Sequence, residues 1–275
     1  MNRSNKTESF LKSRLSDAHH QTRLVLWNLH DSSFLRWRLT QMSRLRRFRN
    51  RHVGEDCFII GNGPSLNRMD LSRLKDYHTF GLNKIFLMSD KVELDLSYHV
   101  AVNPLVIEQS AGEFALLNCP SFLSYRASAG KVPFQDNFYF VYTQSLPIAL
   151  STSIEQPISE GCTVTFVAMQ IAYYMGFRRV FLVGVDHNFH SSGRPHELQV
   201  MSGDDSNHFD PNYFKGLRWN LPDLDGSEVA YTSARYAFRR DDREILDATL
   251  DGKLTIFPKL TFEEALSMAA GKGDR

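Results

Sequence analysis

Short apolar runs alternate with longer amphipathic stretches from about residue 56 onward. The short runs, such as 57–60 (CFII) and 179–184 (RVFLVG), end at glycine or polar residues, as is typical of strands buried on both faces. In the longer stretches, apolar residues recur every three or four positions, which predicts helices. The predicted strands cover 57–60, 78–81, 97–102, 121–124, 138–142, 179–184 and 254–257, and the predicted helices cover 71–74, 105–117, 163–175, 229–250 and 261–269.

This alternation predicts an α/β domain over 53–275. The expected fold is a doubly wound, mostly parallel sheet of the Rossmann-like type, with helices on both faces. Thr261 and Glu264 have the spacing of a capping box at the start of the last helix. Ligands of such folds bind in the crevice at the carboxyl ends of the strands, so the residues that follow each predicted strand are the candidates for function.

Residues 1–52 differ from the rest of the chain in charge. They hold 12 Lys and Arg against 3 Asp and Glu, a net charge of +9, which leaves −8 for residues 53–275 in a chain whose total is +1. Leu35, Leu39, Met42 and Leu45 have helical spacing among arginines, which predicts a basic helical N-terminal extension. The segment 34–51 either lies on an anionic membrane surface or packs against the domain or another subunit.

The composition excludes several classes of protein. With 275 residues, of which 42% are hydrophobic and 23% charged, the chain can build a core and is not disordered, collagen-like or a disulfide scaffold. Cys57, Cys119 and Cys162 have no CxxC spacing and are expected to be reduced. No apolar run has the length of a membrane helix, and the start lacks a signal-peptide core, so a cytoplasmic protein is expected.

A glycine-rich turn follows the first predicted strand, in FIIGNGPSL at 58–66. Gly61 and Gly63 allow the backbone N–H groups to approach a phosphate or nucleotide closely, Ser65 offers a hydroxyl, and Asn62 offers both a donor and an acceptor. The turn is neither a Walker A loop nor a complete GxGxxG motif. Taken alone, it is equally consistent with a tight turn.

Amides also follow the next two strands. Asn83 ends the second strand, Asn103 the third, and Gln109 lies further along the helix that follows. Because consecutive strand ends converge in a doubly wound fold, these residues and Asn62 predict a neutral hydrogen-bonding crevice suited to a nucleobase and sugar hydroxyls. The alternative is that each asparagine is only a turn residue.

Two later blocks supply candidate catalytic groups. Ser159, Glu160 and Gly161 precede a predicted helix, whose N-terminal N–H groups suit an anion. Asp186 and His187 directly follow the strand 179–184, where catalytic groups are expected.

The block 202–214 is polar, aromatic and rich in turn residues. His208 is the candidate general base, because a neutral imidazole accepts a hydroxyl proton near pH 7. Asp204 and Asp205, together with Asp186, are candidate ligands of Mg²⁺, or they are solvated loop acids.

The order of these motifs resembles that of bacterial sialyltransferases that use CMP-sialic acid. The resemblance covers about 57–260 and rests on GNGPSL, Asn83, the run from Asn103 to Gln109, Ser-x-Gly at 159–161, Gly-x-Asp at 184–186 and the Asp-x-Ser-x-His loop at 204–208. The chain is also similar to the MptE-like proteins, whose archaeal members are 6-hydroxymethyl-dihydropterin pyrophosphokinases. The sequences GVDHNF and NHFDPNYF look more like bacterial MptE-like proteins than like the sialyltransferases.

The sialyltransferase-like resemblance implies a division of roles. Asn62, Ser65, Asn83 and Asn103 would hold CMP and its sugar, and Ser159 and Gly161 the phosphate or carboxylate region. His208 would deprotonate the hydroxyl of a cell-surface glycan or lipid-linked acceptor, with inversion at the sugar and without a metal. The family holds its leaving phosphate with tyrosines soon after the Gly-x-Asp strand, whereas Asn188 stands at the first such position here; Tyr213 is the candidate substitute.

The pyrophosphokinase-like resemblance implies ATP and Mg²⁺ in the same crevice, with Asp186, Asp204 and Asp205 as ligands. A third interpretation is a non-catalytic nucleotide-binding module, which needs the glycine turn but not His208. We predict a glycosyltransferase-like enzyme that uses a CMP-sugar, binds no nucleic acid and visits the inner membrane face. The sequence leaves open whether it forms a homo-oligomer.

Overall fold

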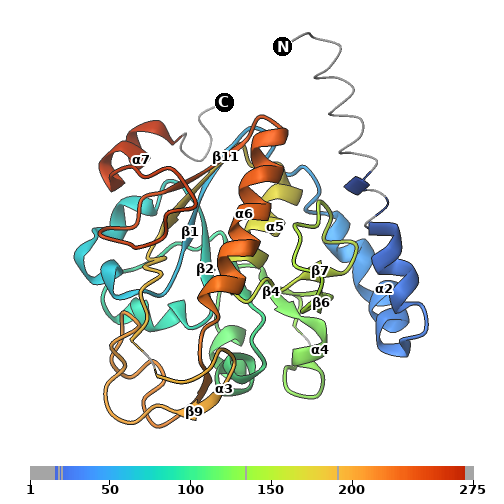
Figure 1. Cartoon of the computed structure of the whole chain (residues 1–275), viewed down its shortest axis with the longest axis horizontal. Helices are drawn as coiled ribbons and strands as arrows, with labels where there is room; N and C mark the ends of the chain where they lie inside the picture. Colours follow the sequence, from blue (N-terminus) through green and yellow to red (C-terminus); the bar gives the residue numbers. More distant parts are fainter. Residues whose placement is uncertain (1–15, 18, 20, 134, 191, 270–275) are drawn as a thin grey trace.

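A computed structural model describes residues 16–17, 19, 21–133, 135–190 and 192–269, and a seven-stranded parallel sheet lies at its centre (Figure 1). The strand order is β11-β8-β1-β2-β3-β4-β5, and every neighbouring pair in it is parallel. The predicted α/β class is therefore confirmed. The strands are β1 (Asp56–Ile60), β2 (His78–Leu82), β3 (Tyr98–Ala101), β4 (Ser121–Ser124), β5 (Phe138–Val141), β8 (Arg179–Val183) and β11 (Glu244–Asp247).

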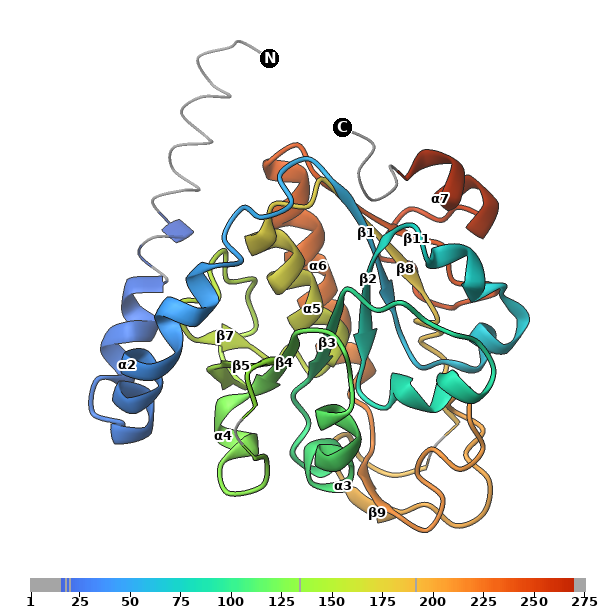
Figure 2. The same cartoon turned by 180° about the vertical axis from the view of Figure 1, so that it is seen from behind.

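Alternate side chains of the strands enter two separate cores, one on each face of the sheet. In β1, Cys57 and Ile59 belong to one core, and Phe58 and Ile60 to the other. The first core is closed by α2 (Ser32–Arg46), α5 (Val164–Met175) and α6 (Leu224–Arg240), and the second by α3 (Pro104–Ala115) and α7 (Phe262–Met268) (Figures 1 and 2). Burial on both faces explains why the strands are continuous apolar runs.

Shorter elements connect this framework. Three 3-10 helices cover Pro64–Arg68, Leu71–Leu74 and Ile85–Asp90, and α4 covers Tyr125–Ser128. Two small sheets pair β6 (Thr143–Gln144) with β7 (Ile158–Ser159), and β9 (Leu198–Val200) with β10 (Arg218–Asn220).

The C-terminal prediction is correct in one element and wrong in two. The capping box of Thr261 and Glu264 is present at the start of α7. The helix predicted over 229–250 instead begins at Leu224 and ends at Arg240, and its predicted last turns form β11. Asp242 has a φ of 54°, which interrupts the helix, and Ile245 then pairs with Val180 of β8. The segment 254–257 is not a strand, although Leu254 and Phe257 are buried.

The N-terminal helix α2 packs on the outer part of the sheet, beside β5 (Figures 1 and 2). Phe34 and Trp37 are fully buried, and Trp37 Nε1 donates a hydrogen bond to the carbonyl of Phe140 at 2.7 Å. Leu35 is 41% and Leu39 85% exposed, so the buried face is offset from the predicted stripe. Of the two alternatives for this segment, the structure places the helix against the domain. The domain boundary at 52/53 stays a prediction.

Candidate functional site

A cavity of about 430 Å³ opens at the carboxyl ends of the central strands. It lies where the strand order reverses: the chain runs outward from β1 through β5 and returns to β8 on the other side of β1. Open α/β sheets bind their ligands at such a switch point. Ten of the predicted site residues line it: Gly61, Asn62, Gly63, Asn83, Asn103, Glu160, Asp186, His187, Asn188 and His208.

The glycine turn after β1 packs directly against the end of β8. A Cβ on Gly61 would lie 2.2 Å from the carbonyl oxygen of Gly184, and one on Gly63 would lie 1.8 Å from Asp186 Oδ2. Both glycines are therefore required by this contact, whatever the cavity binds.

The carboxylate of Asp186 is engaged by the same turn. The backbone N–H of Ser65 donates to Oδ1 at 3.1 Å and its hydroxyl to Oδ2 at 2.7 Å. Burial raises the pKa of Asp186. Asp186 lines the cavity as predicted, but its oxygens join β1 to β8, and Ser65 lies behind it rather than on the cavity wall.

Asn62 and Asn83 each hold a buried side-chain oxygen that has no hydrogen-bond partner among the described residues. Such groups are costly to bury unless a ligand or water satisfies them. Asn103 differs, because its Oδ1 caps α3 by accepting from the N–H of Leu105 at 2.9 Å. The predicted set of amides therefore divides into two whose buried oxygens have no partner among the described residues and one whose oxygen caps a helix.

Four other predicted residues do not line the cavity. Gln109 accepts from Lys84 Nζ and donates to the carbonyl of Arg218. Ser159 is buried, and its hydroxyl has no partner among the described residues. Gly161 packs against the ring of Phe166, where a Cβ would come within 2.3 Å. The fourth, Tyr213, is buried behind His208.

His208 is held on the cavity wall by a buried carboxylate. Its Nδ1 lies 2.8 Å from Asp205 Oδ2, and the side chain of Asp205 is fully buried. The N–H of Asn207 donates to the other oxygen, Asp205 Oδ1, at 2.9 Å. The ring of Tyr213 stacks on the imidazole with centroids 4.0 Å apart and planes 5° from parallel. The imidazole ring of His208 is thus held at its Nδ1 edge by Asp205 and on one face by Tyr213.

The loop that carries His208 is anchored to the glycine turn. The N–H of Phe209 donates to the carbonyl of Asn62 at 2.9 Å, and Lys91 Nζ donates to the carbonyl of Phe209 at 3.0 Å. Lys84 Nζ donates to the carbonyl of Tyr213 at 2.9 Å. Burial lowers the pKa of Lys84 to about 8. The glycine turn at 58–66 and the block at 202–214 therefore form one structural unit.

The three carboxylates of the Mg²⁺ hypothesis are not gathered at one point. Asp204 pairs with Lys215 on the surface, Asp205 lies behind His208, and Asp186 is bonded to Ser65. In the part of the chain that the structure describes, neither group of potential ligands that lies within reach of one ion includes any of these three carboxylates.

Three helices begin at the cavity. Asn103, Thr163 and Asp223 are the N-cap residues of α3, α5 and α6, and all three line it. Each helix directs the positive end of its dipole toward the cavity. The sequence prediction missed Asp223, because it began the helix at residue 229 instead of 224.

No Lys or Arg stands among the described residues that line the cavity, whereas Glu160, Asp186 and Asp223 do. Backbone dipoles and amides rather than cationic side chains are therefore available for an anion. His187 bonds Glu228 at 3.0 Å on the same wall. Other lining residues that the sequence did not single out are Cys162, Phe189, His196, Phe214, Trp219 and Tyr231.

No family model and no curated protein matches the chain, so the MptE-like resemblance stays a prediction. Among solved structures it is similar to the MAf glycosyltransferase from Magnetospirillum magneticum AMB-1, at 15% identity and a TM-score of 0.47 over 84% of this chain and 39% of that one. It is also similar to the sialyltransferase CstII from Campylobacter jejuni in complex with cytidine-5'-monophosphate, at 14% identity and a TM-score of 0.44 over 76% of this chain and 86% of that one.

The chain thus spans about two fifths of the length of the first of these structures. Within the described residues, no helix is both long and apolar enough to cross a membrane.

Proposed function

We propose that the chain is a glycosyltransferase-like enzyme that transfers a sugar from a CMP-sugar donor to a hydroxyl of a cell-surface glycan or lipid-linked acceptor, with His208 as the general base. The observation that carries the proposal is the bonded pair of His208, on the wall of the cavity, and Asp205, buried behind it. The same wall carries Asn62 and Asn83, whose buried side-chain oxygens have no partner among the described residues. A base and a set of neutral hydrogen-bonding groups are what transfer from a nucleotide-sugar requires.

The charge of the cavity favours a donor with few phosphates. Its acidic side chains and the lack of lining Lys or Arg among the described residues disfavour a triphosphate, which carries several negative charges. A CMP-sugar contains a single phosphodiester group, which helix N-termini and backbone N–H groups can hold. Asn62 and Asn83 lie where their oxygens could accept hydrogen bonds from a base amino group or a sugar hydroxyl.

The His208–Asp205 pair suits proton abstraction. With the Nδ1–H donated to Asp205, the lone pair of neutral His208 is on Nε2. As Nε2 takes the proton of the acceptor hydroxyl, the acceptor oxygen attacks the anomeric carbon, and the bond from that carbon to the phosphate oxygen breaks, so that CMP leaves with the electron pair. Asp205 stabilises the imidazolium that forms. Attack from the face opposite CMP inverts the anomeric centre, and this chemistry needs no metal.

The pyrophosphokinase hypothesis is the second candidate, and it makes a different demand. It requires Mg²⁺ between the carboxylates and the phosphates of ATP. The separate engagements of Asp186, Asp204 and Asp205 weigh against it. A non-catalytic nucleotide-binding module would have no use for the His208–Asp205 pair.

Replacing His208 tests the proposal. His208→Ala should abolish transfer from a CMP-sugar and leave the calorimetric affinity for CMP unchanged. His190→Ala is the matched control, because its side chain is exposed and only its backbone bonds Asn207. A fully active His208→Ala variant would remove this residue from the mechanism.

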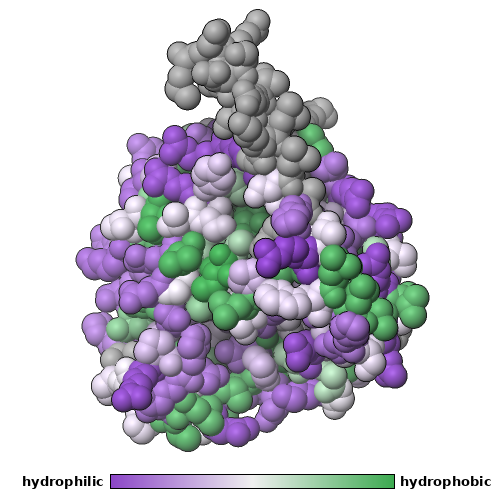
Figure 3. Space-filling view, turned by 45° about the vertical axis from the view of Figure 1, so that its right-hand side comes forward, coloured by the Kyte–Doolittle hydropathy of each residue, from purple (hydrophilic) through white to green (hydrophobic). Residues whose placement is uncertain are grey.

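We further propose that this enzyme meets an anionic membrane through an apolar surface formed by Leu26, Trp27, Leu29, Leu35 and Leu39, which are 56%, 72%, 42%, 41% and 85% exposed. Figure 3 brings this side of the molecule forward and shows hydrophobic side chains among hydrophilic ones. The exposed Arg23 precedes these residues in sequence, and the exposed Arg36 lies among them, between Leu35 and Leu39. Exposed apolar groups beside arginines bind anionic lipid interfaces.

Point variants test this surface better than a deletion, since removing residues 1–52 would also remove buried core residues such as Trp37. Trp27→Ser combined with Leu39→Ser should lose co-sedimentation with phosphatidylglycerol vesicles and keep the wild-type Tm. Leu116→Ser, at an 80% exposed leucine elsewhere, is the control and should bind normally. Failure of the intact protein to bind the vesicles would contradict the membrane proposal without affecting the catalytic one.

A further inference from the structure

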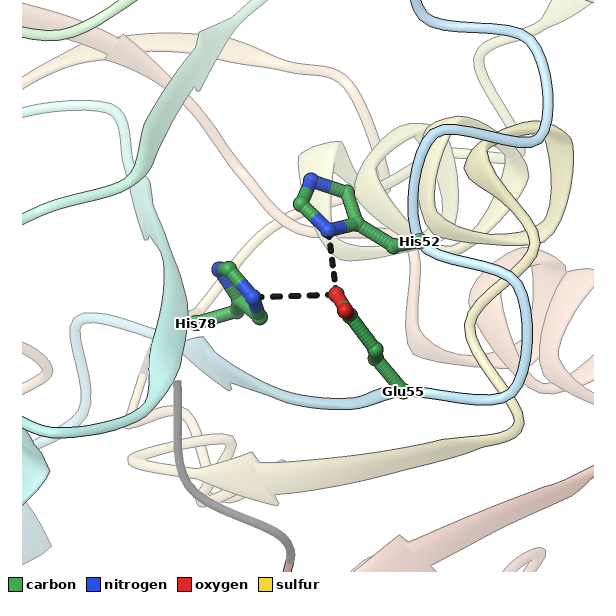
Figure 4. A group of neighbouring side chains, drawn as sticks. All are labelled: His52, Glu55 and His78. Carbon is green, nitrogen blue, oxygen red and sulfur yellow. Dashed lines mark hydrogen bonds and ion pairs between the residues drawn. The ribbon is translucent and has the colours of Figure 1, made fainter. Parts of the chain in front are cut away.

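A second cluster of chemically active side chains lies at the opposite end of the sheet from the cavity. It consists of His52 and Glu55, in the segment between α2 and β1, and His78, the first residue of β2 (Figure 4). Glu55 Oε2 lies 2.5 Å from His52 Nδ1 and 3.1 Å from His78 Nε2. Strand β2 runs from His78 to Leu82, which lines the cavity, so the full length of the strand separates the two sites.

We propose that His52 Nδ1, His78 Nε2 and the carboxylate of Glu55 form a binding site for a divalent transition metal, for which Zn²⁺ is the natural probe. Imidazole nitrogens and a carboxylate oxygen are ligands that Zn²⁺ prefers. The three ligand atoms lie within 4.8 Å of one another. Atoms bound about 2.0–2.1 Å from one zinc at tetrahedral angles are about 3.4 Å apart, so small side-chain movements bring all three into range.

The surroundings of His52 hold its ring in the orientation that a metal ligand needs. Its other nitrogen, Nε2, lies 2.6 Å from the hydroxyl of Tyr98, and the ring stacks on Phe177 with centroids 4.5 Å apart. Ligating histidines commonly donate their second N–H to such an acceptor, which fixes the tautomer. In the metal-bound state Nε2–H would donate to Tyr98, and Nδ1 would be free of its proton.

The site has both a closed and an open side. The side chain of His52 is 9% exposed and that of His78 18%, whereas the side chain of Glu55 is 34% exposed. An ion can therefore enter past Glu55, and water can complete the tetrahedral coordination. Without a metal, the same carboxylate accepts hydrogen bonds from the histidines, so the cluster is stable in both states.

The position of the site indicates a stabilising role. His52 and Glu55 follow α2 along the chain. The backbone N–H of His52 also donates a hydrogen bond to the carbonyl of Met175, at the end of α5, at 2.8 Å. A metal would clamp this segment to the start of β2. Since ligands that bind only the folded state raise the apparent stability, Zn²⁺ should raise the Tm.

A rival group of potential ligands must be controlled for. Cys162, His196 and Asp223 also lie within 4.8 Å of one another, on the wall of the cavity. The binding stoichiometry alone would not distinguish the two groups, so each is removed separately.

The test is calorimetric titration of the full chain with Zn²⁺ after treatment with a chelator, together with the visible spectrum of added Co²⁺. We expect one equivalent to bind with a rise in Tm and a tetrahedral Co²⁺ spectrum. Glu55→Gln, which keeps the size of the side chain, and His78→Gln should each weaken this binding at least tenfold and lose the rise in Tm. The double variant Cys162→Ser with His196→Ala should retain both.

Absence of Zn²⁺ binding by the wild-type chain would overturn the proposal. So would binding that survives Glu55→Gln and His78→Gln, or that disappears in the Cys162 and His196 double variant. Because Glu55 and His78 are not fully buried, far-UV circular dichroism of their variants can establish that they are folded before binding is measured. His190→Gln, at an exposed histidine outside both groups, is the matched control for a general histidine effect and should bind Zn²⁺ as the wild type does.

Discussion

Replacing Asp205 by asparagine should remove the general base without removing any atom from the cavity wall. The N–H of Asn207 donates to Asp205 Oδ1, so the asparagine at this position should keep its oxygen on that side. Its NH₂ group then faces His208 Nδ1, which sits 2.8 Å from the other oxygen of Asp205. His208 must accept there, which moves its proton to Nε2 and leaves no lone pair for the acceptor hydroxyl.

The size of the loss follows from the role that is removed. General base catalysis contributes about 10²–10⁴-fold to a rate, and each factor of ten corresponds to about 1.36 kcal/mol. Asp205→Asn should therefore lower kcat by about 10²–10⁴-fold, or about 2.7–5.4 kcal/mol of transition-state stabilisation. Affinity for CMP should not change, because Asp205 is buried behind His208 and does not line the cavity.

Two measurements check this prediction. Steady-state kinetics with a CMP-sugar give kcat, and the nitrogen chemical shifts of His208 in heteronuclear NMR spectra report the tautomer directly, without any substrate. Asp204→Asn is the matched control: its side chain is 71% exposed and pairs with Lys215, so the variant should behave as the wild type.

The two variants also separate the competing mechanisms. A Mg²⁺-dependent diphosphate transfer that uses both carboxylates would lose activity in Asp204→Asn as well as in Asp205→Asn. An Asp205→Asn variant with the altered tautomer and the wild-type kcat would refute the role of His208 as the base.

Three further predictions follow from the structure. Trp37→Ala should cost about 3–5 kcal/mol of the free energy of unfolding in urea, and Leu39→Ala, at an 85% exposed position on the same helix, less than about 0.5 kcal/mol; equal costs would contradict the packing of α2. Burial lowers the pKa of His99 to about 4, so the unfolded chain binds the extra proton first and stability falls as the pH drops from about 6.5 toward 4, by roughly 3 kcal/mol at most. His99→Gln should flatten this dependence in denaturant titrations, and an unchanged slope would assign it to other groups. Asn62→Ala should weaken CMP binding in calorimetry by about tenfold, the value of one hydrogen bond, whereas unchanged affinity would show that its buried oxygen faces no nucleotide.

The central strands could be predicted from the sequence because their signal is local. Each is a short apolar run buried on both faces, and β1 and β8 begin and end within one residue of the prediction. The strand β11 could not be predicted in the same way. Ile245 and Leu246 continue the helical spacing of the preceding segment, and only the pairing with β8, more than sixty residues earlier, makes them a strand.

The N-terminal helix α2 could also be predicted only in part. Its helical character follows from spacing, but the choice of the buried face does not. Leu39 and Trp37 are both apolar, and the partner that decides between them is the edge of the sheet near Phe140, about a hundred positions away in the sequence. Phe34 and Trp37 fill that interface together with Leu45 of the predicted stripe, whereas Leu35 and Leu39 of the stripe are exposed.

The location of the candidate site could be predicted from the sequence. The hydrogen bonds among its residues could be predicted only in part. Asparagines at successive strand ends pointed to the cavity, because a doubly wound fold brings these ends together. The sequence placed Asp205 among the candidate Mg²⁺ ligands, and only the structure shows that it bonds His208. The contact of the His208 loop with Asn62 could not be foreseen, since the two segments are far apart in the sequence.

Calorimetric titration of the full chain with CMP, CTP and ATP, each with and without Mg²⁺, tests most directly whether the cavity is the donor site of a CMP-sugar transferase. The account predicts that CMP binds without Mg²⁺, that its affinity is unchanged in His208→Ala and that it is reduced in Asn62→Ala. Binding of ATP that depends on Mg²⁺, with no binding of CMP, would contradict it.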